Sequence, residues 1–226
     1  MSKKVENPQD AVVAEAVSKT EAFFEKNGKL VVAILVVLVL LVAGGYAYKS
    51  FVLDRNVAAA EELIVEAQER FAGETPDYAL ALNGDEAGAG FLDVVEQYGS
   101  TPAGNLAKHY AGVCYLHLGD LDLAAEYLAK YKAVKGLAGA VVNAQNIGLR
   151  GDIAVEQGNY EEAVKLYKKA VAASDNNFTA PLYLYKQGLA LVALGNQAEA
   201  KACFQTIVDD YKSSFEAREA ERHLGL

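Results

Sequence analysis

The sequence predicts an all-α protein in which a single N-terminal transmembrane helix precedes an array of α-hairpin repeats. Two observations support this prediction: an uninterrupted apolar run of 19 residues, and a pattern of small residues, turns and large residues that recurs three times downstream. The expected segments are a short N-terminal tail over 1–29, the transmembrane helix over 30–48, linking helices over 49–104, three repeats over 105–212 and a C-terminal capping helix over 213–226.

The apolar run Leu30–Tyr48 contains no charged residue. At about 1.5 Å of rise per residue, such a helix spans just under the ~30 Å hydrocarbon core of a bilayer. Tyr46 and Tyr48 stand beside Lys49 at one end, where an aromatic belt and a cation are expected. A cleavable signal peptide has a core of roughly 7–15 apolar residues behind a short basic start. Because 29 residues precede this longer run, we expect an uncleaved signal anchor.

Flanking charges give the expected orientation of this helix. They are Lys19, Lys26 and Lys29 before it, and Lys49 and Arg55 after it. The excess before the span favours a cytoplasmic N-terminus, which places the large C-terminal part outside the cytoplasm. Upstream, residues 11–27 carry apolar side chains at helical spacing. They are either a short amphipathic helix on the membrane surface or a solvated tail.

The part of the chain after the span is strongly acidic. Residues 1–49 carry six Lys and five acidic residues, whereas residues 50–226 carry 15 Lys or Arg and 25 acidic residues. The difference in the second part is 15 − 25, or −10. A surface of that charge repels the phosphate backbone, so nucleic acid is not an expected partner.

Motifs of catalysis or cofactor binding are missing from the sequence. Gly84–Gly90 is glycine-rich but has no following Lys-Ser/Thr and no clear preceding strand, so we expect a loop. His109 and His117 lie eight residues apart, too far along a helix to share a metal ion. Cys114 and Cys203 show no metal-binding spacing and are expected to be buried thiols. We therefore expect no enzyme, no cofactor and no metal site.

Three stretches align around a small-residue helix, a Gly-Asx turn and a second helix. The turns are Gly119-Asp120, Gly158-Asn159 and Gly195-Asn196; the small residues before them are Ala111-Gly112, Gly151 and Gly188; those after them are Ala124, Ala163 and Ala200; and the large residues that follow are Leu128, Tyr167 and Phe204. Only Gly or Ala lets two helix backbones cross closely, and the large residue is expected to fill the gap towards the next hairpin. The turn glycine ends the first helix in a left-handed conformation, and the Asx residue can cap the second.

Helices are also expected on both sides of the repeats. Phe51–Phe71 has apolar residues at helical spacing, Gly73–Gly90 is a polar and glycine-rich break, and Phe91–Tyr98 is a further short helix. The capping helix is expected to turn Phe215 and Leu224 inward and its charged residues outward, because repeat arrays need polar-faced ends to stay soluble.

The repeat positions resemble the tetratricopeptide repeat, a helical hairpin of 34 residues with the same order of small and large residues. The resemblance covers residues 105–212. Repeat one departs from it at Lys108, where an early Trp or Leu is expected, and residues 137–143 and 176–180 are interpreted as extra linkers between repeats.

That resemblance implies a partner-binding groove lined by the first helix of each repeat. The positions carried over are Leu106, His109, Val113, Leu116 and His117 in repeat one, Gln145, Gly148, Asp152, Val155 and Glu156 in repeat two, and Leu182, Tyr185, Leu189, Val192 and Ala193 in repeat three. The outer repeats are mostly apolar here and the middle one is polar or acidic. Apolar positions suit a partner helix or an unfolded segment. The alternative is that several of these residues pack against a neighbouring helix.

The whole layout resembles the bacterial YfgM family, whose members are ancillary subunits of the SecYEG translocon. Phe23–Lys29 is similar to the start of that family, and Asn83–Asp85, Gly99–Ala107 and Ala180–Leu184 are similar to repeat proteins of the Bacteroidetes. The resemblance implies a non-enzymatic protein of the bacterial inner membrane, with a periplasmic repeat domain that passes newly translocated proteins to periplasmic chaperones. A PpiD-like chaperone is the implied partner. The alternatives are a scaffold in cell-envelope assembly or a Tol–Pal-type system, and an organelle import receptor.

Overall fold

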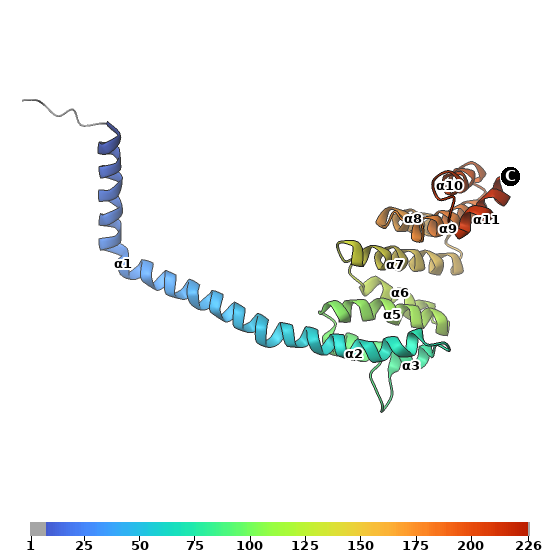
Figure 1. Ribbon diagram of the computed structural model, residues 1–226, viewed down its shortest axis with the longest axis horizontal. Helices are drawn as coiled ribbons and strands as arrows, with labels where there is room; N and C mark the ends of the chain where they lie inside the picture. The colour runs from blue at the N-terminus through green and yellow to red at the C-terminus, as the bar shows by residue number, and fades with distance from the viewer. Residues whose placement is uncertain (1–7, 226) are drawn as a thin grey trace, which may run out of the picture. The chain divides into compact units, whose positions relative to one another are not determined.

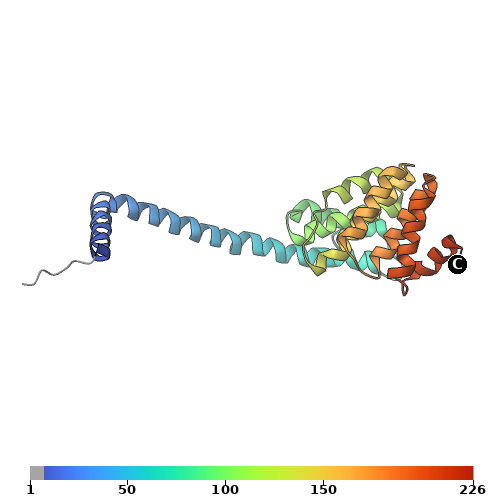
Figure 2. The same cartoon turned by 90° about the horizontal axis from the view of Figure 1, so that it is seen from above.

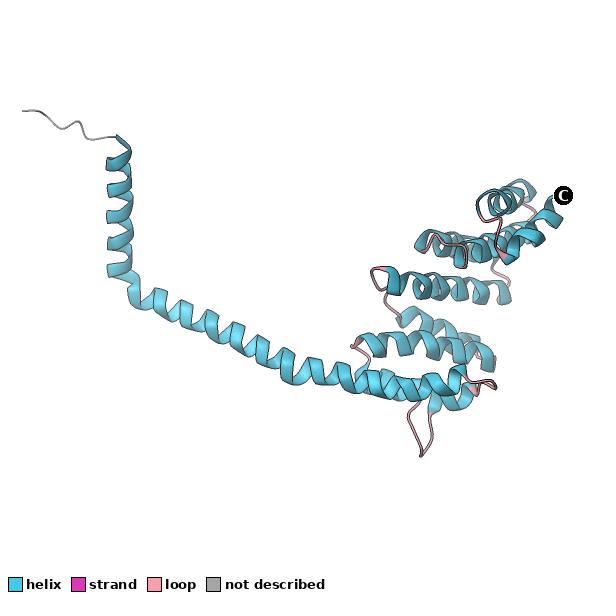
Figure 3. Ribbon diagram, in the orientation of Figure 1, coloured by secondary structure: helices cyan, strands magenta, loops and turns pink. Residues whose placement is uncertain are grey.

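A computed structural model describes residues 8–225, and helices are its only regular elements apart from one isolated β-bridge between Asp85 and Gly88 (Figure 3). The predicted all-α fold is therefore confirmed over that range. The helices are α1 (Pro8–Tyr48), the π-helix η1 (Lys49–Leu53), α2 (Asp54–Ala72), α3 (Tyr78–Asn83), α4 (Phe91–Tyr98), α5 (Pro102–Leu118), α6 (Leu121–Lys130), α7 (Leu137–Glu156), α8 (Tyr160–Ala173), α9 (Thr179–Ala193), α10 (Gln197–Asp210) and α11 (Phe215–Leu224). The chain divides into two units, Met1–Arg55 and Asn56–Leu226.

The first unit is dominated by α1, which contains the predicted membrane span. The helical stretch Glu25–Ala72 is long and apolar enough to cross a membrane, and none of its most apolar window is buried. A core helix of a water-soluble domain would bury that window, so the exposure favours a membrane anchor over that alternative. Residues 1–7 of the predicted tail lie outside the described residues, as do the side chains of residues 8–17, on which the expected amphipathic face depends.

In the second unit, α5–α6, α7–α8 and α9–α10 form three successive hairpins, as expected (Figures 1 and 2). The turn glycines Gly119, Gly158 and Gly195 have φ of 83°, 73° and 79°, the left-handed region in which a side chain is strained. Asp120 and Asn159 then cap the second helix, accepting hydrogen bonds from backbone amides three residues on. In the third hairpin Asn196 occupies the cap position without a side-chain hydrogen bond.

In each hairpin, a glycine of the first helix faces the large residue of the second helix. A Cβ on Gly112 would lie 2.6 Å from Leu128, and one on Gly188 would lie 2.6 Å from the ring of Phe204. Gly151 makes the same approach to Tyr167, at 2.7 Å. The large residue therefore fills space within its own hairpin, a role that was not expected.

The expected contact with the following element is present as well. The ring of Tyr167 stacks on Tyr183 of α9 with 6.2 Å between centroids, and Phe204 stacks on His223 of α11 at 4.5 Å. Leu128 shares a buried cluster with Ile153 of α7. One large residue per repeat thus links two layers of the array.

Two sequence predictions about the array were wrong. Residues 137–143 are no linker, because α7 begins at Leu137; the connection is instead 131–136, which ends at Gly136 with φ 85°. Phe215 is 86% exposed, whereas Ala217 and Ala220 form the buried face of α11 with Leu224 packed beside them. At 100° per residue, Phe215 lies opposite Ala217 on the helix, so both cannot face inward.

α2 packs on the array through α3, α4 and α5. Ala60, Ile64 and Ala67 of α2 share a core with Phe91 and Val94 of α4. The short helix α3 was not expected inside the glycine-rich break. It lies between α2 and the predicted loop 84–90, which the structure places next to α2.

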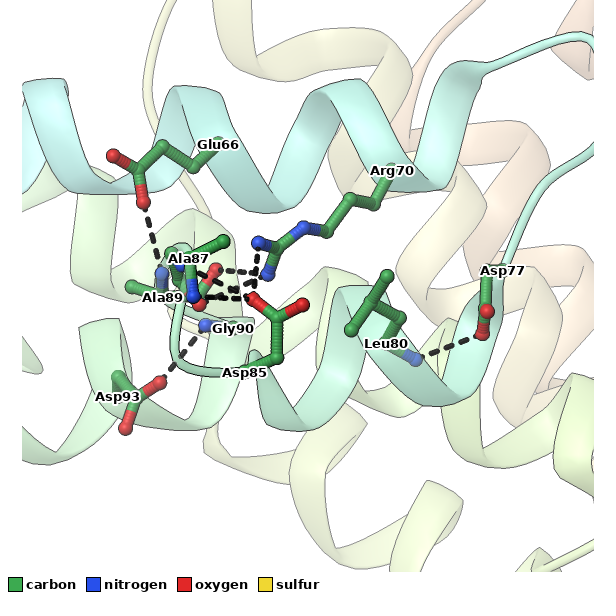
Figure 4. A network of polar contacts seen from close by, with 10 residues as sticks. Glu66, Arg70, Asp77, Leu80, Asp85, Ala87, Ala89, Gly90 and Asp93 are labelled. Carbon is green, nitrogen blue, oxygen red and sulfur yellow. Dashed lines mark hydrogen bonds and ion pairs between the residues drawn. The ribbon is translucent and has the colours of Figure 1, made fainter.

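Loop 84–90 is clamped by charged side chains of α2 (Figure 4). Arg70 donates to the carbonyls of Gly88 and Ala89 at 3.0 and 3.2 Å and forms an ion pair with Asp85 at 2.8 Å. Glu66 accepts the amide of Ala89 at 2.8 Å. These contacts hold the loop against α2.

Candidate partner-binding groove

Many of the predicted groove residues lie in contacts between helices. Leu106 packs against the buried core that α2, α4 and α5 share. Leu116, Leu182 and Tyr185 pack against the buried clusters that contain Leu128, Tyr167 and Phe204, respectively. Val113 and Gln145 are half-buried, and Ala193 is exposed. Leu106, Leu116, Leu182 and Tyr185 therefore follow the alternative interpretation, in which such residues pack against a neighbouring helix.

Both predicted groove histidines have structural partners. His109 is 4% exposed, and its Nδ1 lies 3.3 Å from the amide nitrogen of Asn146 in α7. Burial lowers the pKa of His109 to about 4, because the charged imidazolium is poorly solvated there. His117 stacks on Tyr78 with 3.9 Å between ring centroids and 2° between planes. Within the described residues, no group of three or more His, Cys, Asp or Glu could hold a metal ion.

Gly148 serves the packing of one repeat on the next. A Cβ at this position would lie 2.0 Å from the ring of Tyr183, so only glycine lets α9 approach α7 this closely. Cys114 and Cys203 are buried free thiols, as expected. Burial raises the pKa of Cys114 to about 12, which keeps its thiol protonated and unreactive at neutral pH.

Four of the predicted groove residues do come together, in a pocket of about 440 Å³ between α7, α8 and α9. The predicted members are Asp152, Val155, Glu156 and Leu189, and the others are Tyr160, Tyr167, Lys186 and Ala190. Pockets of this size accommodate a few side chains of a partner. Val192, one turn after Leu189, is 37% exposed outside the pocket lining.

An ion pair lines the pocket between repeats two and three. Lys186 lies 2.8 and 2.7 Å from the two carboxylate oxygens of Asp152, and the hydroxyl of Tyr167 donates to the same carboxylate at 2.7 Å. The side chains of Lys186 and Asp152 are 32% and 28% exposed, so solvent screens the pair only in part. Burial, followed by the hydrogen bond to Asp152, raises the pKa of Tyr167 and keeps its phenol neutral.

Sequence reasoning missed Tyr160, Tyr167, Lys186 and Ala190 as pocket residues. The acidic character expected for the middle repeat is thus partly compensated, because Lys186 neutralises Asp152 while Glu156 stays exposed. The repeat pattern gives no signal for this pairing: corresponding positions of repeats two and three lie 37 residues apart, as Gly151 and Gly188 do, whereas Asp152 and Lys186 lie 34 residues apart.

The arrangement offers apolar contact beside a satisfied polar network. Val155, Leu189 and Ala190 supply the apolar lining, and Glu156 is exposed beside them. A neutral apolar side chain fits this lining, whereas a free carboxylate would find the lysine already paired.

Comparison with known proteins agrees with this repeat geometry. No curated protein matches the chain. A family described as a tetratricopeptide repeat-like domain matches residues 21–221, which includes the apolar helix, all three hairpins and most of α11. The chain therefore belongs to the tetratricopeptide repeat-like domain family.

Proposed function

We propose that this protein is a membrane-tethered binding module that holds apolar segments of other proteins in the pocket between α7, α8 and α9. The observation that carries the proposal is the pocket itself, in a fold that commonly serves protein interaction. Its apolar side is formed by Val155, Leu189 and Ala190. Burial of one or two partner side chains there supplies the main attraction, at ~25 cal/mol per Å² of apolar surface.

The polar side of the pocket sets which partners fit. Asp152 is neutralised by Lys186 and Tyr167, so a partner need not bring a charge to match it. Glu156 is exposed and favours a basic residue beside the apolar one. Extended or helical segments of unfolded chains carry such mixed patterns, which supports newly made proteins as the bound class.

At the cellular level, we propose an accessory subunit of the Sec translocon that passes newly translocated proteins to periplasmic chaperones. The support is the resemblance of the layout to the YfgM family and the long apolar helix ahead of the repeats. In this proposal the N-terminus is cytoplasmic and the repeats are periplasmic. SecYEG subunits and a PpiD-like chaperone are the expected neighbours.

Site-specific photocrosslinking in intact cells tests the proposal. A photoreactive residue at Leu189 should capture newly translocated proteins, translocon subunits or the chaperone. The matched control is the same residue at Lys169, which is exposed on α8 outside the pocket. Crosslinks to envelope-assembly or Tol–Pal proteins alone would refute the translocon role and keep the binding module. Equal crosslinking at both positions would refute the pocket as the binding site.

A further inference from the structure

The connection between α6 and α7 combines positive charge with exposed apolar side chains. From residue 127 to residue 151 the chain contains four basic residues, Lys130, Lys132, Lys135 and Arg150, and no acidic residue. Val134 and Leu137 are 44% and 95% exposed. We call residues 130–137 the basic strip. It interrupts a domain whose total charge is strongly negative.

The backbone of the basic strip is held in place by two asparagines. Asn105 of α5 donates to the carbonyl of Lys132 at 2.7 Å and accepts its amide at 2.8 Å. Asn143 of α7 pairs in the same way with Val134, at 2.8 and 3.0 Å, and accepts the hydroxyl of Tyr131 at 2.8 Å. The strip is therefore preorganised, and little conformational entropy would be lost when it binds a surface.

Lys130 and Lys132 of the strip repel a third lysine, Lys108 of α5. Lys108 of α5 has a lowered pKa, first because burial disfavours its charge and then because Lys132 and Lys130 lie near it. Lys130 is paired with Glu126 at 2.6 Å, whereas Lys132 and Lys135 are exposed. A negatively charged surface placed against the strip would relieve this repulsion.

The strip lies at the edge of the array where α2 begins. Helices α2 and α5 run in the same direction: Phe71, near the end of α2, lies 5.0 Å from Tyr110, and Tyr78 just beyond it stacks on His117 in the last turn of α5. The start of α5 binds the strip through Asn105. Figure 1 accordingly has the start of α2 and the α6–α7 connection on the same side of the array.

Chain connectivity ties this edge to the apolar helix. Residues 49–55 are the only link between Tyr48 and the second unit, which begins at Asn56. Seven residues reach at most about 25 Å even when fully extended. The chain therefore enters the second unit at this edge, eight residues after Tyr48.

We propose that the basic strip binds the anionic lipid surface of the membrane that α1 spans, with Val134 and Leu137 entering the headgroup region and the lysines facing lipid phosphates. The proposal rests on the membrane anchor of the proposed function. Apolar insertion combined with basic residues is the established chemistry of peripheral lipid contact. A lipid surface is favoured over an acidic protein because the strip lies at the tethered edge. Such contact would hold this edge at the bilayer. The turn at Gly119, on the opposite edge of the array, would then point away from the bilayer.

The chain contains no tryptophan, so one introduced residue gives an unambiguous signal. The full-length Leu137→Trp protein is reconstituted into phosphatidylcholine vesicles with or without phosphatidylglycerol, and quenching of its fluorescence by brominated lipids is measured. The matched control is Leu118→Trp, a half-exposed position beside the turn at Gly119, at the opposite edge of the array. A Lys130/Lys132/Lys135→Gln variant removes the charge, and Lys165/Lys168/Lys169→Gln on α8 removes an equal charge elsewhere.

The expected result is strong quenching of Leu137→Trp in phosphatidylglycerol vesicles and little quenching of Leu118→Trp. Loss of the three strip lysines should weaken the contact well over tenfold, since each lysine contributes about fivefold near an anionic surface, and the α8 variant should not. Absent quenching at Leu137→Trp, equal quenching at both positions, or insensitivity to phosphatidylglycerol and to the strip lysines would each overturn the proposal. Failure of the protein to resist carbonate extraction from the vesicles would instead refute the anchor, and this inference with it.

Discussion

Single glycines and alanines decide how closely the helices of this protein cross. Gly112, Gly151 and Gly188 each face the large side chain of their own hairpin at a distance that excludes any Cβ. The alanines on the second helices, Ala124 and Ala163 among them, are fully buried at the same crossings. The sequence predicted these small residues, because each hairpin requires one where its two helices cross closely and the pattern therefore recurs.

Ala124→Leu should destabilise the protein by about 1–3 kcal/mol, because the added atoms overpack a closed helix crossing. The matched control is Ala193→Leu, at an exposed helical position, where about 0.5 kcal/mol or less is expected. Urea unfolding of the full-length protein in detergent measures both. Equal stability of the two variants would show that the crossing has room for the added atoms.

At the scale of elements, the sequence predicted those helices whose signals are local. α4 spans Phe91–Tyr98 as expected, and the Gly-Asx turns lie where the pattern placed them. The start of α7 was misplaced because the extra helical turns at Leu137 have no counterpart in the repeat pattern, and α3 was missed inside a glycine-rich stretch. Both depend on tertiary contacts that a single sequence does not display.

The same distinction applies to the groove. Asp152, Val155, Glu156 and Leu189 were found from repeat positions, because these positions recur. The pairing of Asp152 with Lys186 depends on the register between two hairpins, and so does the burial of His109 against Asn146. Neither contact could be predicted from the sequence alone, because both depend on how the helices pack.

Asn143→Ala should loosen the connection between α6 and α7, because it removes hydrogen bonds to Val134 and Tyr131. The expected loss is about 1–3 kcal/mol, since polar backbone groups lose their partner. Hydrogen exchange at the Val134 amide should accelerate. The control is Asn177→Ala, at an exposed position in the α8–α9 connection. It should leave hydrogen exchange at the Val134 amide as in wild type. Unchanged protection of Val134 would mean that the asparagine does not hold the connection.

At the scale of the whole molecule, an apolar helix and a repeat domain are joined in one chain, which is the architecture of a tethered binding module. Alkaline phosphatase fused after Leu226 should be active, because the lysines before the span favour a cytoplasmic N-terminus. The mature protein should also retain its N-terminal peptide. An inactive fusion would place the repeats in the cytoplasm and favour an import-receptor role, and a mature N-terminus near Tyr48 would mean that the anchor is removed.

The central claim is that the pocket between α7, α8 and α9 binds partners while other predicted groove positions serve packing. Leu189→Gln and Leu116→Gln make the same change at a 39% exposed pocket residue and at a residue packed against Leu128 and Ile153. Glutamine is chosen over glutamate because Asp152 and Glu156 line the same pocket.

The deciding measurement pairs thermal melting with crosslinking of these two variants to translocon and chaperone subunits. Leu189→Gln should melt like wild type, within about 0.5 kcal/mol, and lose its crosslinks. Leu116→Gln should cost about 1–3 kcal/mol, because a polar amide replaces an apolar side chain that packs against Leu128 and Ile153. A Leu189→Gln protein that melts normally and keeps every crosslink, or that unfolds early like Leu116→Gln, would contradict the claim.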